Sequence, residues 1–161
     1  MKLFIITLNL CWLFQSYAHE HGHAKINGIY ENSVILLELN MPLEQLVGFE
    51  HAPKKDTKKQ ELIIKAMAKL DQGLEEIFLF TEPHHTIPCK GKTLEKTISK
   101  NHHPDLLWQV QFKCQKKPVN LSVNLSRFYR VEKITIELLA NGKAHKRSHS
   151  SAMASLSWPH D

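Results

Sequence analysis

Hydrophobic and polar residues alternate with a period of two along most of this chain, which is the pattern of strands that bury one face. Trp108, Val110 and Phe112, for example, are separated by glutamines. The pattern predicts strands over 24–30, 33–39, 92–98, 106–114, 119–125, 133–139 and 152–158. The first two strands are predicted to pair as a hairpin through Glu31-Asn32. Residues 74–80 fit a strand and a helix equally well.

One stretch, residues 57–72, has the periodicity of a helix instead. Its apolar stripe recurs every four positions, at Leu62, Ala66 and Leu70. Asp56 is a suitable N-cap, Gly73 can end the helix, and lysines occupy the opposite face. Together these elements predict the α+β class: a single domain in which one main amphipathic helix packs on an antiparallel sheet. The lysine face is either simply solvated or meets an anionic partner.

The first 18 residues have the pattern of a secretory signal peptide. Lys2 gives a positive start, residues 3–14 are mostly apolar, and Ser16 and Ala18 place small residues before a cleavage site. The apolar run is too short to cross a bilayer, and no later stretch is apolar enough to do so. We therefore expect export, removal of residues 1–18 and a mature domain of residues 19–161 without stable membrane insertion.

Loss of the signal peptide changes both the charge and the cysteine count. The full chain has 21 basic and 16 acidic residues, and removal of Lys2 leaves 20 − 16 = +4 with neutral histidines. Export argues against nucleic acid as the partner of this positive charge. Cys11 is lost with the signal, which leaves Cys89 and Cys114. An even pair in an exported protein predicts a disulfide rather than two metal-binding thiols.

Eleven histidines are the unusual feature of the composition, and histidine is a common metal ligand. His19, His21 and His23 alternate at the expected mature N-terminus. A free α-amine, two backbone nitrogens and the His21 imidazole could bind square-planar Cu(II) or Ni(II). Alternatively, an extended segment would project all three imidazoles to one side, toward tetrahedral Zn(II). The third alternative is a solvated terminus without a ligand.

The remaining histidines fall in separate places. His51 follows Glu50 in a predicted loop and is either a ligand or a surface residue. If Cys89 faces Cys114 across a hairpin, His102-His103 lie at its tip and His84-His85 beyond its other end, too far apart to share one site. His145 and His149 lie among basic residues and serines and are expected to be exposed. No hydrolase motif or phosphate loop is present, which argues against an enzyme.

Three segments together resemble a known family, the ZrgA-like proteins of the Gram-negative periplasm, which are linked to zinc acquisition. The segments are 19–24, 46–53 and the Cys89…His102-His103…Cys114 spacing, and the likeness extends over most of the mature chain. The resemblance implies a periplasmic zinc-binding accessory protein that works with a zinc importer. It also implies that the ligands are His19, His21, His51 and one of His102 or His103.

This chain departs from that family at two places. Residues 90–101 are short and basic where many relatives have a long insert rich in histidine and acidic residues, so one or two discrete sites are expected rather than bulk storage. Tyr129 stands where a proline is usual, which is expected to alter only a turn.

The sequence therefore leads to the hypothesis of a non-catalytic, periplasmic protein that binds Zn(II), or Cu(II) or Ni(II) at the mature N-terminus, and assists zinc uptake. The candidate ligands are His19, His21, His23, His51, His102 and His103, with Glu50 orienting His51. Binding should weaken below about pH 6, because protons compete for imidazole nitrogens. The alternatives are a non-metal envelope interaction or chaperone module and, third, a zinc hydrolase.

Overall fold

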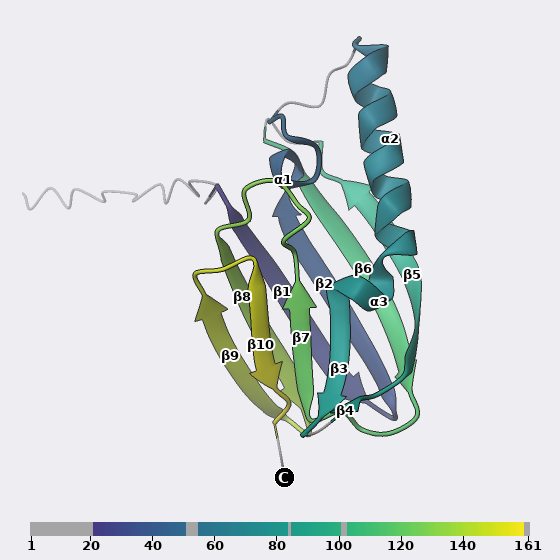
Figure 1. Ribbon diagram of the computed structural model, residues 1–161, viewed down its shortest axis with the longest axis vertical. Coiled ribbons are helices and arrows are strands. Elements are labelled where there is room, and N and C mark those ends of the chain that lie inside the picture. Colours follow the sequence, from purple (N-terminus) through teal and green to yellow (C-terminus); the bar gives the residue numbers. More distant parts are fainter. Residues whose placement is uncertain (1–20, 51–54, 84, 101–102, 160–161) are drawn as a thin grey trace, which may run out of the picture.

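The computed structural model of the chain describes residues 21–50, 55–83, 85–100 and 103–159, so the predicted signal peptide lies outside it. Within these ranges, ten strands and three helices are found (Figure 1). The strands are β1 (His23–Glu31), β2 (Val34–Pro42), β3 (Phe78–Glu82), β4 (His85–Thr86), β5 (Cys89–Ile98), β6 (Asp105–Cys114), β7 (Asn120–Asn124), β8 (Lys133–Ala140), β9 (Lys143–His149) and β10 (Met153–Ser157). The helices are α1 (Leu43–Val47), α2 (Thr57–Gln72) and α3 (Leu74–Ile77).

The strands form two sheets rather than the single antiparallel sheet that was predicted. The larger sheet has the order β5-β6-β2-β1-β8-β9 and the smaller one β10-β7-β3-β4. Strands β1 and β8 pair in parallel, from His23 opposite Lys133 to Tyr30 opposite Ala140, so the larger sheet is mixed. The α+β class is confirmed, but the one-sheet architecture was wrong. Alternation identifies a strand that buries one face and says nothing about which sheet it joins.

The hydrophobic core lies between the two sheets. Aromatic side chains of the smaller sheet pack on those of the larger one, with ring centroids of Phe80 and Phe112 4.8 Å apart and those of Phe78 and Trp108 5.7 Å apart. The centre of β1 is a glycine because the core leaves it no room. A Cβ on Gly28 would lie 2.6 Å from a methyl carbon of Leu138.

Two local predictions are confirmed with small shifts. Strands β1 and β2 form the expected hairpin, whose turn is Asn32-Ser33, one residue later than predicted. Both turn residues have positive φ, 50° and 65°, which suits a two-residue hairpin turn. The disulfide is also present: Cys89 pairs with Cys114 across β5 and β6, with an S–S distance of 2.05 Å.

The main helix α2 has the predicted bounds and caps. The Asp56 carboxylate accepts a hydrogen bond from Lys59 N at 3.2 Å, and Gly73 is the C-cap. Burial in α2 is confined to its C-terminal half, where Leu70 is buried; toward its beginning Leu62 and Ile64 are 52% and 68% exposed. Figure 1 shows that the helix extends past the end of the sheets. The helix contacts α1 and edge strand β5 instead of lying across a sheet face.

Three segments differ from the sequence-based expectation. Helix α1 follows Pro42 in a segment for which no helix was predicted, and residues 74–80 divide into α3 and the beginning of β3. Strand β9 was missed because both of its faces are exposed, so its sequence does not alternate. Within the described ranges, none of the helices combines the length and apolar character that crossing a membrane requires.

Candidate metal centre

Two segments from the first third of the chain meet at one end of the larger sheet. Because β1 and β2 are antiparallel, with Lys25 opposite Asn40, the beginning of β1 lies beside the end of β2. Helix α1 follows β2 directly and ends at Gly48, whose φ is +81°. This left-handed turn directs the chain back toward α1. His21, two residues before β1, therefore shares one corner of the molecule with α1 and the loop that follows it.

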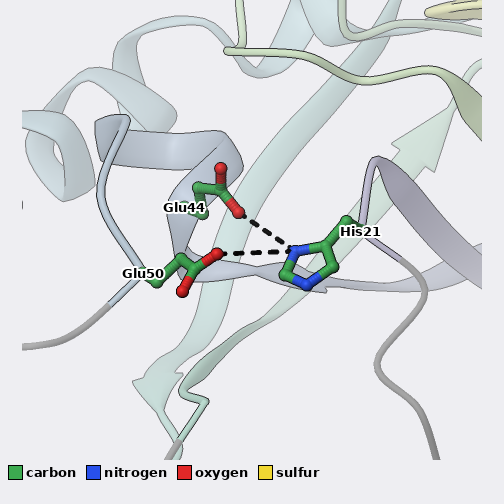
Figure 2. A group of neighbouring side chains, drawn as sticks. All are labelled: His21, Glu44 and Glu50. Carbon is green, nitrogen blue, oxygen red and sulfur yellow. Dashed lines mark hydrogen bonds and ion pairs between the residues drawn. The ribbon is translucent and has the colours of Figure 1, made fainter.

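A histidine and two carboxylates converge at this corner. The Nδ1 atom of His21 lies 3.2 Å from Glu44 Oε2 and 4.0 Å from Glu50 Oε1 (Figure 2). One ligand atom from each of the three residues lies within 4.8 Å of the other two. Four ligands bound tetrahedrally to zinc at 2.0–2.1 Å are about 3.4 Å apart. The spacing of the group is thus close to what a zinc ion requires, and a small closure of Glu50 would complete it.

The group lines a small acidic pocket of about 210 Å³. Beyond the three donor residues, the pocket is lined by Gly22, Gln45, Arg130 and Glu132. The lining residues thus include three acidic residues and one basic residue, and this excess of negative charge favours a divalent cation. The side chain of His21 is 62% exposed, that of Glu50 46% and that of Glu44 22%, so the pocket is open to solvent.

Backbone hydrogen bonds hold the parts of this corner in place. The carbonyl of Gly22 accepts bonds from Glu132 N at 2.8 Å and Lys133 N at 3.0 Å. The amide of Tyr129 donates to the carbonyl of Gln45 in α1 at 2.7 Å. A proline at position 129 has no N–H to donate. The tyrosine at this position therefore does more than alter a turn: its amide anchors the helix that carries Glu44.

Of the alternatives for the N-terminal histidines, the one in which an extended segment projects His21 and His23 to the same side is wrong. Gly22 has a φ of +78°, so the chain turns there instead of remaining extended. His21 faces the carboxylates, whereas His23 is buried and its Nε2 lies 2.8 Å from Thr135 Oγ1 on β8. Thr135 Oγ1 in turn lies 2.8 Å from Ser148 Oγ on β9. The structure surrounds His23 with this network, and the metal role predicted for it stays a prediction.

The other predicted ligands are only partly described. His19, His51 and His102 lie outside the described residues. His103 is half-buried beside Pro104, whose carbonyl accepts a hydrogen bond from Leu43 N at 2.8 Å, so His103 lies at the same end of the sheet as α1. In the described part of the chain, the three-residue donor group includes none of the other histidines.

The remaining described histidines lie elsewhere. His85 in β4 pairs with Glu82 at 3.0 Å and lies beyond the disulfide end of the β5–β6 hairpin, opposite the end that carries His103. His145 is exposed on edge strand β9, as expected. His149 is half-buried, and its Nε2 lies 3.1 Å from the carbonyl of Ser155.

Glu44 is the site residue that sequence reasoning missed. Pro42 followed by an acidic residue in the first turn is a helix-start signal that could have revealed α1. Nothing in the sequence, however, pairs Glu44 with a histidine 23 positions earlier. The Glu50 carboxylate lies 4.0 Å from His21 Nδ1. The role predicted for Glu50 in orienting His51 stays a prediction, because His51 lies outside the described residues.

Comparison with known proteins identifies one family. A family model described as "ZrgA family zinc uptake protein" matches residues 18–158, a range that includes all three donor residues and both cysteines of the disulfide. A search of curated proteins found no match. Since the family model covers nearly the whole chain, this protein belongs to the ZrgA family of zinc uptake proteins.

Proposed function

We propose that this protein is a periplasmic, non-catalytic accessory protein that binds zinc and passes it on during zinc uptake, with His21, Glu44 and Glu50 as ligands. The observation that carries the proposal is the 3.2 Å approach of His21 Nδ1 to Glu44 Oε2 in an acidic, open pocket. Membership of a zinc uptake family supports the choice of metal.

The chemistry of the donor set suits zinc as a cargo. Zinc accepts imidazole nitrogen and carboxylate oxygen together, and three protein ligands leave a fourth position for water or for a donor from another protein. Exposed ligands allow such a donor to reach the ion. The periplasmic component of a zinc importer is the partner we propose, since it would have to take zinc from a carrier of this kind.

Two further features support the location. The signal-like residues 1–18 predict export, and a disulfide such as Cys89–Cys114 persists in an oxidising compartment. Both are consistent with an extracytoplasmic protein, and the family resemblance points to the periplasm.

Histidines outside the described residues are proposed as additional donors. His51 follows Glu50 directly in the chain, and His19 lies two residues before His21. If the mature chain begins at His19, Cu(II) or Ni(II) bound by the terminal amine would use the His21 imidazole that zinc also needs. We therefore propose that copper and zinc compete for this protein rather than bind independently.

The test is a zinc titration of protein exported from the full gene, purified from the periplasm and stripped with chelator. Replacing His21 with alanine should weaken zinc binding by at least about tenfold, because a ligand is lost. The matched control is His145→Ala, which removes an exposed histidine from β9. If His21→Ala and His145→Ala bind zinc as tightly as the wild type, zinc is not bound at this corner.

A further inference from the structure

The side chain of Gln45 is the anomaly of the acidic pocket. Gln45 is only 2% exposed, yet neither its amide nitrogen nor its amide oxygen has a hydrogen-bond partner in the described part of the chain. Burying an amide without a partner costs free energy, and native proteins seldom leave such groups unsatisfied. A group of this kind indicates that something else occupies its hydrogen-bonding positions in the working protein.

The position of Gln45 indicates what that something is. It lines the same pocket as His21, Glu44 and Glu50, and it neighbours Glu44 in α1. Its main chain is fixed, because its carbonyl accepts the hydrogen bond from Tyr129 N at 2.7 Å. Gln45 is therefore a buried polar residue, with a fixed main chain, in the wall of an acidic pocket.

We propose that Gln45 is the fourth protein residue of the zinc site and that its amide gains its partners when the ion is bound. The amide oxygen would contact the zinc ion or a water on it, and the amide N–H groups would donate to the carboxylates that hold the ion. This inference rests on the proposed function. It goes further because it assigns a role to a neutral residue that ligand patterns in a sequence cannot reveal.

The Gln45 amide should therefore destabilise the zinc-free protein and strengthen its binding of zinc. Methionine has nearly the same shape and no amide, so Gln45→Met should leave the zinc-free protein at least as resistant to denaturant as the wild type. The same variant should bind zinc at least about fivefold more weakly. Mutation of residues that hydrogen-bond to metal ligands commonly lowers metal affinity by about 10–100-fold. A residue that only fills space would not change the two properties in opposite directions.

A second variant tests the same point with the opposite sign. Gln45→Glu places another carboxylate at the buried position, which should lower the resistance of the zinc-free protein to denaturant. The added charge should tighten zinc binding if position 45 reaches the coordination shell. The control is Gln60→Met on the exposed beginning of α2, which should leave the zinc affinity unchanged.

The experiment is a competitive zinc titration and a denaturant titration of wild type, Gln45→Met, Gln45→Glu and Gln60→Met, each exported and chelator-stripped. Cobalt(II) absorption spectra of the wild type and Gln45→Met report the coordination shell directly, and the two spectra should differ. If both Gln45 variants bind zinc with wild-type affinity while the wild type binds tightly and His21→Ala does not, this inference fails and the proposed function stands. If the wild type binds no zinc, both fail.

Discussion

His21 reaches the acidic pocket because the next residue is a glycine. Gly22 has a φ of +78°, which side-chain-bearing residues rarely adopt, and a Cβ there would lie 3.2 Å from the Arg130 carbonyl oxygen and from the side chain of Glu132. The turn takes His21 out of the strand alternation that continues through β1. One backbone angle thus directs His21 toward the carboxylates and leaves His23 buried.

The two carboxylates of the group are expected to contribute unequally. Glu44 is closer to His21 than Glu50 is, 3.2 against 4.0 Å, and is less exposed. Glu44→Gln should therefore weaken zinc binding by about tenfold or more. Glu50→Gln should weaken it less. Isothermal titration with a competing chelator measures both, with Glu61→Gln on the exposed face of α2 as the control. Equal, wild-type affinity of the Glu44 and Glu50 variants would show that neither carboxylate is a ligand.

Acid should release the zinc. Without the metal, a proton on His21 Nδ1 would be donated to the Glu44 carboxylate 3.2 Å away, so proton and zinc compete for the same atoms. Affinity should fall as the pH decreases, because protons compete with the metal for the imidazole nitrogen. Dissociation constants measured from pH 5 to pH 8 test this, and His21→Ala should have a flatter profile. A wild-type affinity that is constant over the range contradicts imidazole ligation.

At the scale of elements, α2 is fastened to edge strand β5 by a polar cluster at its C-terminal end. Asp71 accepts hydrogen bonds from Thr93 and Lys96, and the Lys96 ammonium also donates to the Met67 carbonyl at 2.8 Å. Burial alone would raise the pKa of Asp71, but the hydrogen bonds from Lys96 and Thr93 and the charge of Lys96 outweigh it and lower the pKa below its ordinary value. The ionised form therefore stabilises the attachment of the helix.

Asp71→Asn should lower the free energy of unfolding at neutral pH by about 1 kcal/mol, because the aspartate is about half exposed and solvent screens the pair. A lowered folded-state pKa means that the contribution is present above the ordinary pKa of aspartate and is lost as the pH falls through the lowered value. Denaturant titrations at pH 7 and pH 3 should thus show a difference between wild type and variant that shrinks in acid. A difference that grows in acid would contradict the assignment, and Glu61→Gln should show no difference at either pH.

Elements with local signals could be predicted from the sequence, and contacts between distant segments could not. The 57–72 helix carries its own caps and stripe, and the Asn32-Ser33 hairpin its own turn residues. The parallel pairing of β1 with β8 joins segments about a hundred residues apart, and no local pattern records it. The same holds for the site. Histidine enrichment identified His21, but Glu44 and Gln45 became visible only once α1 was placed beside the beginning of β1.

At the scale of the whole molecule, the stabilising crosslink and the candidate metal centre lie at opposite ends of the larger sheet. Cys89 and Cys114 pair at one end of the β5–β6 hairpin, whereas Asp105, at the other end of β6, lies opposite Pro42, next to α1. Stability and metal binding should therefore be separable. The hydrophobic core between the sheets connects the two ends, so neither the disulfide nor the metal centre should depend on the other.

Replacing both cysteines with serine tests this separation. The disulfide spans 25 positions, and its loss should lower the free energy of unfolding by about 3 kcal/mol by freeing the unfolded chain. Zinc affinity, measured under conditions where the variant remains folded, should stay at the wild-type value. A loss of zinc affinity in the folded double variant would mean that the site depends on the distant end of the hairpin.

The most direct measurement is a crystal structure of the zinc-loaded, exported protein, with anomalous diffraction data collected on both sides of the zinc absorption edge. We predict an anomalous peak between His21 Nδ1, Glu44 Oε2 and Glu50 Oε1, about 2.0–2.2 Å from each. A zinc peak bound elsewhere on the molecule, with this corner still closed by the hydrogen bond between His21 and Glu44, would contradict the assignment.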